Sequence, residues 1–507
     1  MKKKNFLFFG LSIFLLFLFF PHINSNINAC TMILCGKSST KDGSILLAHN
    51  NDLLGNISSL IKIVPGSKHK PEDKILFKNG LIIPQAKQTY RMLIMECYYG
   101  YSEGDAVAIN QFQVSIAGGV SLKEDRNIKA READPIIKTG VSGYIRYIAL
   151  QRSKSARECV ELIGKMYSKY GISYPSGVGV ADANEVWYIE AGGGKCWVAQ
   201  RVPDNSYLVV ANGYRIGNID FSDRENFIFP SYLKDYTIRK GLWNPNKEPL
   251  NFSKTFGRNR RIKNKFYNTR RVWRVQNLLT PSMPQPPGLS KYPFVLKPDK
   301  KITVKRLVGV LRDYYNKTQF DTMNKISLSS ELKERSIGVF STVHTDVIQL
   351  RSWMPAEIGA VLWGGLGSSL STPYIPYYFG IKEVLKSFRS AENDFDCKSA
   401  YWDFKCLAML IKSDSLRLIN KVLLKWQEFE NSLFSLQSLV EEIVLKLYHN
   451  SEESAKDFLT LYSYGLSLEA LNIAKKLKKE LKTKIDKKVY NFGVNLFQEI
   501  FYLTLKI

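Results

Sequence analysis

The chain has 507 residues, enough for about two or three domains with a substantial core. Hydrophobic residues make up 45% and charged residues 23%, a balance that excludes disordered and collagen-like chains. The 72 Lys and Arg residues outnumber the 46 Asp and Glu residues, and the net charge of +26 predicts a surface that attracts anions. The seven cysteines are too sparse for a disulfide scaffold, and their odd number leaves at least one thiol unpaired.

Residues 1–29 have the layout of a secretory signal. Lys2 to Lys4 precede an almost wholly apolar run from Phe6 to Phe20, and a polar stretch then ends at Ala29. The apolar run is shorter than the roughly 20 residues that span a bilayer. We therefore predict cleavage after Ala29 and export to the periplasm, the cell envelope or the medium, with Cys30 as the first residue of the mature chain.

Cys30 at this cleavage site is open to three interpretations. It is an ordinary cysteine, a lipid-modified cysteine like those that end bacterial lipoprotein signals, or an N-terminal nucleophile. In the third case cleavage releases an α-amine with a pKa near 8 beside a thiol with a pKa of about 8.5, so one residue supplies nucleophile and base. Lipidation would modify both groups, so the second and third interpretations exclude each other.

The segment after Cys30 has the pattern of a β-hairpin. Thr31 to Cys35 is mostly apolar, Lys41-Asp42-Gly43 has turn residues, and Ser44 to Ala48 reads as a second strand. Asp52 then lies just past the end of the second strand. From there its carboxylate could return to the start of the first strand and accept a hydrogen bond from the α-amine of Cys30.

The rest of the chain divides by its hydrophobic period. Short alternating strands dominate to about Asp223, with a helical pattern from Gly143 to Tyr170 that Ser153 can cap. Residues 224–300 are aromatic and loop-rich and predict a surface excursion. Residues 382–507 read almost entirely as amphipathic helices. The pattern predicts an α+β fold, with residues 30–381 as one domain and 382–507 as a helical C-terminal region.

Metal and nucleic-acid functions find little support. No two histidines have His-x-x-x-His spacing and no two cysteine pairs have ligand spacing, so we predict no metal site and no cofactor. Gly257 to Arg274 holds eight Lys or Arg residues among aromatic ones, as in a nucleic-acid patch. An exported chain rarely meets nucleic acid, so we predict no nucleic-acid partner. An anionic envelope surface is a better candidate, and lysine-rich composition without any partner is the simplest explanation.

At Cys30 the sequence resembles a known family. Residues 30–53 read CTMILCGKSSTKDGSILLAHNNDL and resemble the opening of the cysteine N-terminal-nucleophile dipeptidases of the dipeptidase A type: Cys-Thr, an apolar strand, Gly-Lys, Asp-Gly-Ser and Ala-Arg-Asn-x-Asp. Secernins are relatives of that family, and bile salt hydrolases and penicillin V acylases are more distant ones. Further blocks follow in family order at Ala181–Asp220, Leu311–Asp321, Ser341–Trp363 and Ser399–Trp402. The resemblance implies a four-layer α/β/β/α core with the helical segment packed on it.

The resemblance also implies roles for individual residues. Cys30 is the expected nucleophile, with its own α-amine as the base, and Asp52 is expected to hold that amine. Asn212, after the strand Leu208 to Ala211, resembles the asparagine whose side-chain amide helps to form the oxyanion hole. Arg271 resembles the arginine near the thiol, and Arg270 is the near-equal alternative for binding the substrate.

His49 departs from the family pattern, which usually has arginine at this position. A neutral His49 would remove a cation from the substrate-binding site unless Arg270 or Arg271 compensates. It would also make activity depend on pH near 6.5. The alternative is a histidine whose hydrogen bonds are satisfied inside the hairpin.

The expected function is that of an exported cysteine dipeptidase that hydrolyses small peptides through a thioester. An acylase acting on N-acyl amides is the alternative within the same superfamily. A lipid-anchored, non-catalytic binding protein on the same fold is the alternative outside the enzymes. The sequence leaves the oligomeric state open, a homo-oligomer included, as well as the preferred side chains of the peptide.

Overall fold

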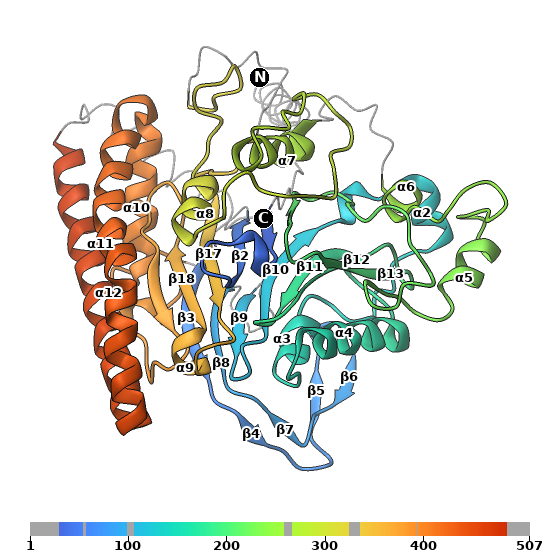
Figure 1. Cartoon of the computed structure of the whole chain (residues 1–507), viewed down its shortest axis with the longest axis horizontal. Coiled ribbons are helices and arrows are strands. Elements are labelled where there is room, and N and C mark those ends of the chain that lie inside the picture. Colours follow the sequence, from blue (N-terminus) through green and yellow to red (C-terminus); the bar gives the residue numbers. More distant parts are fainter. Residues whose placement is uncertain are drawn as a thin grey trace, which may run out of the picture.

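The computed structural model describes residues 30–53, 57–98, 106–257, 266–323, 335–392 and 394–483. The predicted signal at residues 1–29 and the last 24 residues of the predicted helical region lie outside the described residues. The described residues form two large antiparallel sheets with helices on their outer faces (Figure 1).

The first sheet has seven strands in the order β16-β14-β1-β2-β17-β18-β19. Strand β1 is Thr31–Cys35, as predicted. Strand β2 is Ile45–Asp52, so the prediction that Asp52 lies past the strand was wrong. The strand continues because β17 pairs with it over its whole length, down to Thr342 opposite Asp52. The other strands of this sheet are β14 Tyr207–Val210, β16 Val295–Leu296, β17 Thr342–Leu350, β18 Val361–Leu366 and β19 Ile375–Tyr378.

The second sheet has eight strands in the order β15-β13-β12-β11-β10-β9-β8-β3. Their residues are β3 Ser58–Val64, β8 Met92–Tyr98, β9 Ala106–Asn110, β10 Ser115–Ser121, β11 Ser176–Ala181, β12 Val186–Ala191, β13 Trp197–Val202 and β15 Phe227–Ile228. Two small two-stranded sheets, β4 Ser67–Lys68 with β7 Gln88–Thr89 and β5 Lys74–Leu76 with β6 Ile82–Pro84, extend from the strand connection β3 to β8.

Helices cover the outer faces of both sheets. Helices α3 (Ile145–Leu150) and α4 (Ala156–Tyr170) contact the second sheet, and α8 (Val304–Leu311) and α10 (Ala400–Ser413) contact the first. Helices α11 (Ser415–Asn450) and α12 (Glu452–Lys482) form a long hairpin beside α10 (Figure 1). The predicted four-layer α+β fold is confirmed. Within the described ranges, no helix combines the length and the apolarity needed to cross a bilayer.

One further local prediction was wrong. Ser155, and not Ser153, caps α4, because the Ser155 side chain accepts a hydrogen bond from the Glu158 N–H while Ser153 bonds the Ala149 carbonyl. Between stretches of loop, the described part of residues 224–300 contains three helices, and the last of them packs against β14. The helices are α5 Leu233–Arg239, α6 Phe252–Phe256 and α7 Phe266–Leu279; two short helices elsewhere are α2 Ile128–Ala133 and α9 Ala356–Gly359.

Candidate active site

Cys30 directly precedes β1 and is almost completely buried, with 2% of its surface exposed. The pairing of Thr31 with Asn50 places Cys30 beside Asn51 at the end of β2. The thiol of Cys30 donates a hydrogen bond to the side-chain oxygen of Asn51, over 3.4 Å. No disulfide joins any of the seven cysteines, all of which lie in the described residues, so the sulfur of Cys30 is not part of a crosslink.

Arg271 on α7 joins Cys30 to Asn212. Its Nη1 donates to the Cys30 carbonyl at 2.7 Å and to Thr31 Oγ1 at 3.0 Å. Its Nη2 donates to Asn212 Oδ1 at 3.3 Å and to Asn268 Oδ1 at 2.8 Å. Burial, and to a smaller extent the nearby cation of Arg335, lower the pKa of Arg271 to about 10, so the side chain remains charged at neutral pH.

Arg270, the predicted alternative, lies in a different environment. Its guanidinium stacks 3.6 Å above the ring of Phe320 and donates to the Pro287 carbonyl at 3.0 Å. Successive residues of a helix point about 100° apart, so only one of these two arginines can face Cys30. The structure places Arg271 there.

Asn212 lies two residues after the end of β14 and has a positive φ of 52°, which non-glycine residues adopt infrequently. Arg271 bonds its side-chain oxygen, and its amide nitrogen donates to the Ser121 carbonyl at 3.1 Å. Because Arg271 orients the oxygen, the N–H end of the amide is directed toward the second sheet. One N–H of this amide is therefore used by Ser121, and the oxyanion role of Asn212 stays a prediction.

Asp52 is buried at the end of β2 and is held by two groups. Thr342 donates to its Oδ1 at 2.5 Å, and Arg335 Nη2 lies 2.9 Å from its Oδ2. Burial raises the pKa of Asp52, while the charge of Arg335 and the Thr342 hydrogen bond lower it. Arg335 was not predicted, because no motif surrounds it in the sequence and it meets Asp52 only through the fold.

Asn51 links Cys30 to a second group of side chains that the sequence did not predict. Its amide nitrogen lies 3.3 Å from Cys97 Sγ on β8 and 3.5 Å from His344 Nε2 on β17. The other ring nitrogen of His344 lies 3.6 Å from the same sulfur. The candidate nucleophile is therefore held from β2, and Asn51 is in turn held from both sheets.

His49 lies fully buried in the space between the sheets, with no exposed surface. Side chains alternate along a strand, so His49 and Asn51 share one face of β2 while Asp52 lies on the other. Burial, His344 and Arg146 hold the pKa of His49 well below its ordinary value, so the predicted pH dependence near 6.5 is wrong for this ring. Neither ring nitrogen has a hydrogen-bond partner within the described residues, which contradicts the alternative of a satisfied histidine.

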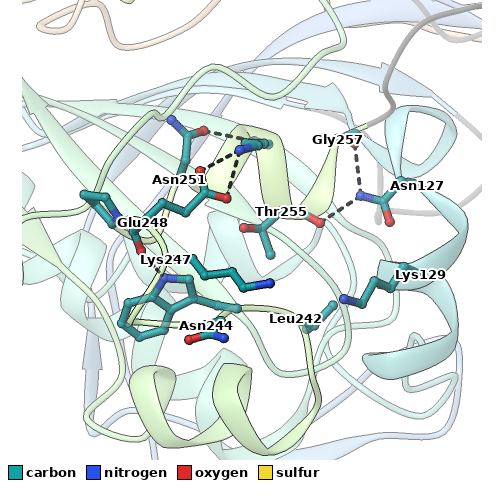
Figure 2. A pocket seen from close by; sticks show the side chains of 12 residues that line it. Asn127, Lys129, Leu242, Asn244, Lys247, Glu248, Asn251, Thr255 and Gly257 are labelled. Atoms are coloured by element: carbon teal, nitrogen blue, oxygen red, sulfur yellow. Dashed lines mark hydrogen bonds and ion pairs between the residues drawn. The ribbon is translucent and has the colours of Figure 1, made fainter.

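Two cavities lie near this region. A small one of about 60 Å³ is lined by Ala211 and Gly213, the neighbours of Asn212, and by three charged residues, Asp125, Arg215 and Lys291. A larger one of about 380 Å³ is lined by Lys129, Lys247 and other residues, and shares Gly257 with the first (Figure 2). None of the predicted site residues lines the larger cavity.

Comparison with known proteins identifies the family of the chain. The profile of peptidase family C69 matches residues 29–428. A probable dipeptidase of Latilactobacillus sakei is 31% identical over 392 residues, which cover 76% of this chain and 82% of that protein. A probable dipeptidase B of Lactococcus lactis subsp. lactis is 29% identical over 75% of this chain and 80% of its own length. Dipeptidase A of Lactobacillus helveticus is 27% identical over 75% of this chain and 81% of its own length.

These matches confirm the predicted resemblance to dipeptidases of the dipeptidase A type. The profile covers most of the chain, from the residue before Cys30 into helix α11, and so includes every predicted site residue. The chain belongs to peptidase family C69.

Proposed function

We propose that the protein is a dipeptidase that uses Cys30 as an N-terminal nucleophile after removal of residues 1–29. The family match and the names of the relatives support peptide hydrolysis. The observation that carries the proposal for this site is Arg271, which contacts both Cys30 and Asn212. Nucleophile, cation and oxyanion donor thus converge from β1, α7 and the end of β14.

The reaction proceeds in two stages. The α-amine of Cys30 takes the thiol proton, and the sulfur attacks the carbonyl carbon of the peptide bond to form a C–S bond. Asn212 stabilises the oxyanion, for which such a donor contributes roughly 2.7–4 kcal/mol. The C–N bond then breaks, and the leaving amine takes the proton from the ammonium. Water then attacks the thioester carbon while the α-amine takes one of its protons; the C–S bond breaks, the acyl part departs as the carboxylic acid, and the ammonium returns the proton to the sulfur.

A short peptide suits the surroundings of Asn212. The small cavity beside it is lined by one acidic residue, Asp125, and by two basic residues, Arg215 and Lys291. A dipeptide has a positive and a negative end, so groups of both signs close to the reacting carbonyl match its termini. An N-acyl amide lacks the positive end.

Export through the secretory pathway belongs to the same proposal, because the base in this mechanism exists only once Cys30 is the first residue. Mass analysis of the mature N-terminus tests this step. A free Cys30 is expected. A diacylglyceryl-modified Cys30 or an intact Met1 would exclude the mechanism, and a modified Cys30 would favour the lipid-anchored binding protein.

Product analysis with dipeptides tests the activity. The wild-type protein should release free amino acids, and Cys30→Ser should lose nearly all hydrolysis with an unchanged circular dichroism spectrum. Cys397→Ser is the matched control, because Cys397 is exposed and lies outside the site. Inertness toward dipeptides together with cleavage of N-acyl amides would replace the proposal with the acylase alternative.

A further inference from the structure

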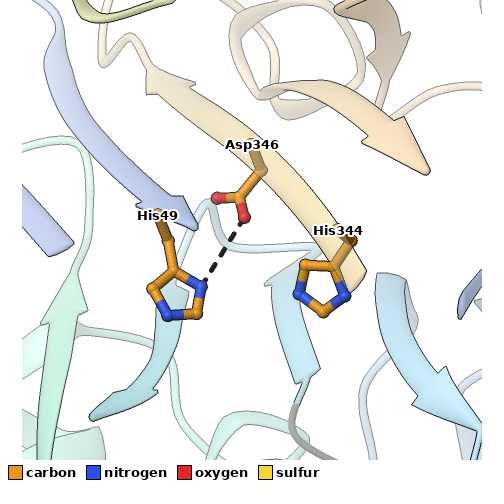
Figure 3. Close-up of side chains that lie close together, drawn as sticks. All are labelled: His49, His344 and Asp346. Carbon is orange, nitrogen blue, oxygen red and sulfur yellow. Dashed lines mark ion pairs between the residues drawn. The ribbon is translucent and has the colours of Figure 1, made fainter. Parts of the chain in front are cut away.

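Three side chains that can ligate metals lie together between the two sheets, although they are far apart in the sequence. His49 is on β2, and His344 and Asp346 are on β17 (Figure 3). His49 pairs directly with Asp346, and His344 is two residues away on the same face. One ligand atom from each of the three lies within 4.8 Å of the others, and all three residues are fully buried.

Two of these side chains lack hydrogen bonds. Both ring nitrogens of His49 and both carboxylate oxygens of Asp346 are buried without a hydrogen-bond partner in the described part of the chain. The nearest approach between them is 3.8 Å, from His49 Nδ1 to Asp346 Oδ1. Buried polar atoms are nearly always paired, because an unpaired one costs roughly 1–3 kcal/mol. The unpartnered Nδ1 of His49 and the unpartnered carboxylate of Asp346 lie next to each other, which indicates a missing ligand between them.

The opposite sheet makes room for this cluster. Gly118 on β10 has a φ of +66°, and a Cβ at this position would come within 2.8 Å of His49 Cε1. The register of β10 against β11 shifts at this point, between Ile116 and Gly119. The bulge and the missing side chain together leave space for the His49 ring.

We propose that His49, His344 and Asp346 bind a divalent transition-metal ion of the zinc class. Two imidazoles and one carboxylate are a common zinc ligand set, and a water molecule would complete the tetrahedron. Ligand atoms around a tetrahedral zinc, each about 2.0–2.1 Å from the metal, lie roughly 3.3 Å apart, so binding draws the three side chains together.

The surroundings of the cluster suit this ligand set. Burial, His344 and Arg146 favour the neutral form of His49 by lowering its pKa, and metal ligation requires that form. The contact of His344 Nδ1 with Cys97 Sγ leaves Nε2 on the side of the cluster and resembles the outer-shell contacts that orient ligating histidines. The charge of Arg146 opposes a cation, and ionisation of Asp346 on binding offsets it.

This site would also affect the candidate nucleophile. His344 Nε2 lies 3.5 Å from the Asn51 amide nitrogen, and the Asn51 oxygen accepts from the Cys30 thiol. His344 Nε2 has a single lone pair, for which a metal ion and the Asn51 N–H would compete. Occupancy of the site would therefore change how Asn51 holds Cys30. Asn51 lies between Cys30 and the ligand His344, and the ion takes no part in the proposed reaction steps.

Metal content tests the proposal on the full chain. Protein produced in zinc-supplemented medium and separated from free metal should carry about one equivalent of zinc by mass spectrometry of the element. Asp346→Asn, which keeps the size of the side chain, and His49→Gln should each reduce the bound zinc at least tenfold. Cys30→Ser and His449→Gln, which lie outside the ligand set, should retain it.

A second measurement covers the case in which a ligand variant folds poorly. Cobalt added to metal-depleted wild-type protein should give the visible absorption of a tetrahedral site without a thiolate charge-transfer band, because none of the three ligands is a cysteine. Wild-type protein without stoichiometric zinc and without this cobalt spectrum overturns the proposal. Full metal retention in both Asp346→Asn and His49→Gln overturns it as well.

Discussion

Arg271 is the residue on which the candidate active site depends most. It bonds the main chain of Cys30, the hydroxyl of Thr31 and the amide oxygens of Asn212 and Asn268. A planar guanidinium with five N–H donors can serve four acceptors in different directions, whereas an ammonium on a flexible chain cannot hold the same geometry. Charge and shape of this side chain are therefore both required.

Replacing Arg271 by lysine tests this requirement. Arg271→Lys keeps the charge but loses the bridge to Asn212, so we expect kcat/KM for a dipeptide to fall about a hundredfold, which corresponds to about 2.7 kcal/mol. Arg270→Lys is the matched control on the same helix and should change kcat/KM little, because Arg270 stacks on Phe320. Equal losses of kcat/KM in the two variants would show that the choice of Arg271 as the site arginine is wrong.

At the scale of single elements, strand β12 holds the segment that follows Asn212. Glu190 on β12 is fully buried, and its carboxylate accepts hydrogen bonds from the N–H groups of Arg215, at 2.5 Å, and Ile216, at 3.2 Å. Burial raises the pKa of Glu190 to about 8, and these hydrogen bonds lower it only in part. The contact between β12 and the segment after Asn212 is therefore sensitive to pH.

The free energy of unfolding should fall as the pH rises, because of Glu190. Its folded pKa of about 8 exceeds the ordinary value of 4.5, so the folded state binds the proton more tightly than the unfolded state. The contribution is fully present below pH 4.5 and is lost as the pH rises toward 8, at up to about 1.4 kcal/mol per pH unit. Urea titrations across this range should show a slope that Glu190→Gln reduces. An unchanged slope in the variant contradicts the assignment.

Strand β10 depends on a glycine at its bulge. Gly118→Ala places a methyl group 2.8 Å from the His49 ring and forces a non-glycine residue into a φ of +66°. We expect a loss of roughly 1–3 kcal/mol in the free energy of unfolding. Gly309→Ala in helix α8 is the control, because a methyl group added there would have no neighbouring atom of the described residues within 4 Å outside its own helix backbone. That change should stabilise the protein by about 0.5–1 kcal/mol, so losses of the same size in both variants would contradict this interpretation.

At the scale of the whole molecule, two buried ion pairs attach the C-terminal helices to the two-sheet core. Arg312, at the end of α8, meets Glu430 on α11 at 2.6 Å, and Arg351, after β17, meets Glu441 on α11 at 2.7 Å. Both carboxylates receive two N–H groups from one guanidinium. The helical hairpin is thus a part of the folded unit that contains the site.

Removing one partner of such a pair should be costly. Glu430→Ala leaves the buried Arg312 charge unpaired, and we expect the free energy of unfolding to fall by about 3–5 kcal/mol. Glu442→Ala breaks an exposed pair with Lys446 on the same helix and should cost far less, because water and salt screen exposed charges. Chemical denaturation measures both. Similar costs would mean that the helices are attached mainly by apolar contacts.

Features encoded by neighbouring residues were predictable. The apolar run after Cys30 and the turn residues that follow it predict strand β1 correctly, and ordered sequence blocks predict the family and the layered fold. Strand and helix periods depend on residues two to four positions apart. Local patterns failed at the ends of elements, as at Asp52, where pairing with β17 extends β2 beyond its apolar residues.

By itself, the sequence determined the fold class, the family and Cys30 as the candidate nucleophile, because these rest on contiguous motifs. Only the tertiary structure decided which side chains surround Cys30. Arg335 reaches Asp52, and His344 reaches both Asn51 and His49, through strand pairing between segments about 290 residues apart. Sheet register sets such contacts, and register depends on the packing of the whole core rather than on any local pattern of residues.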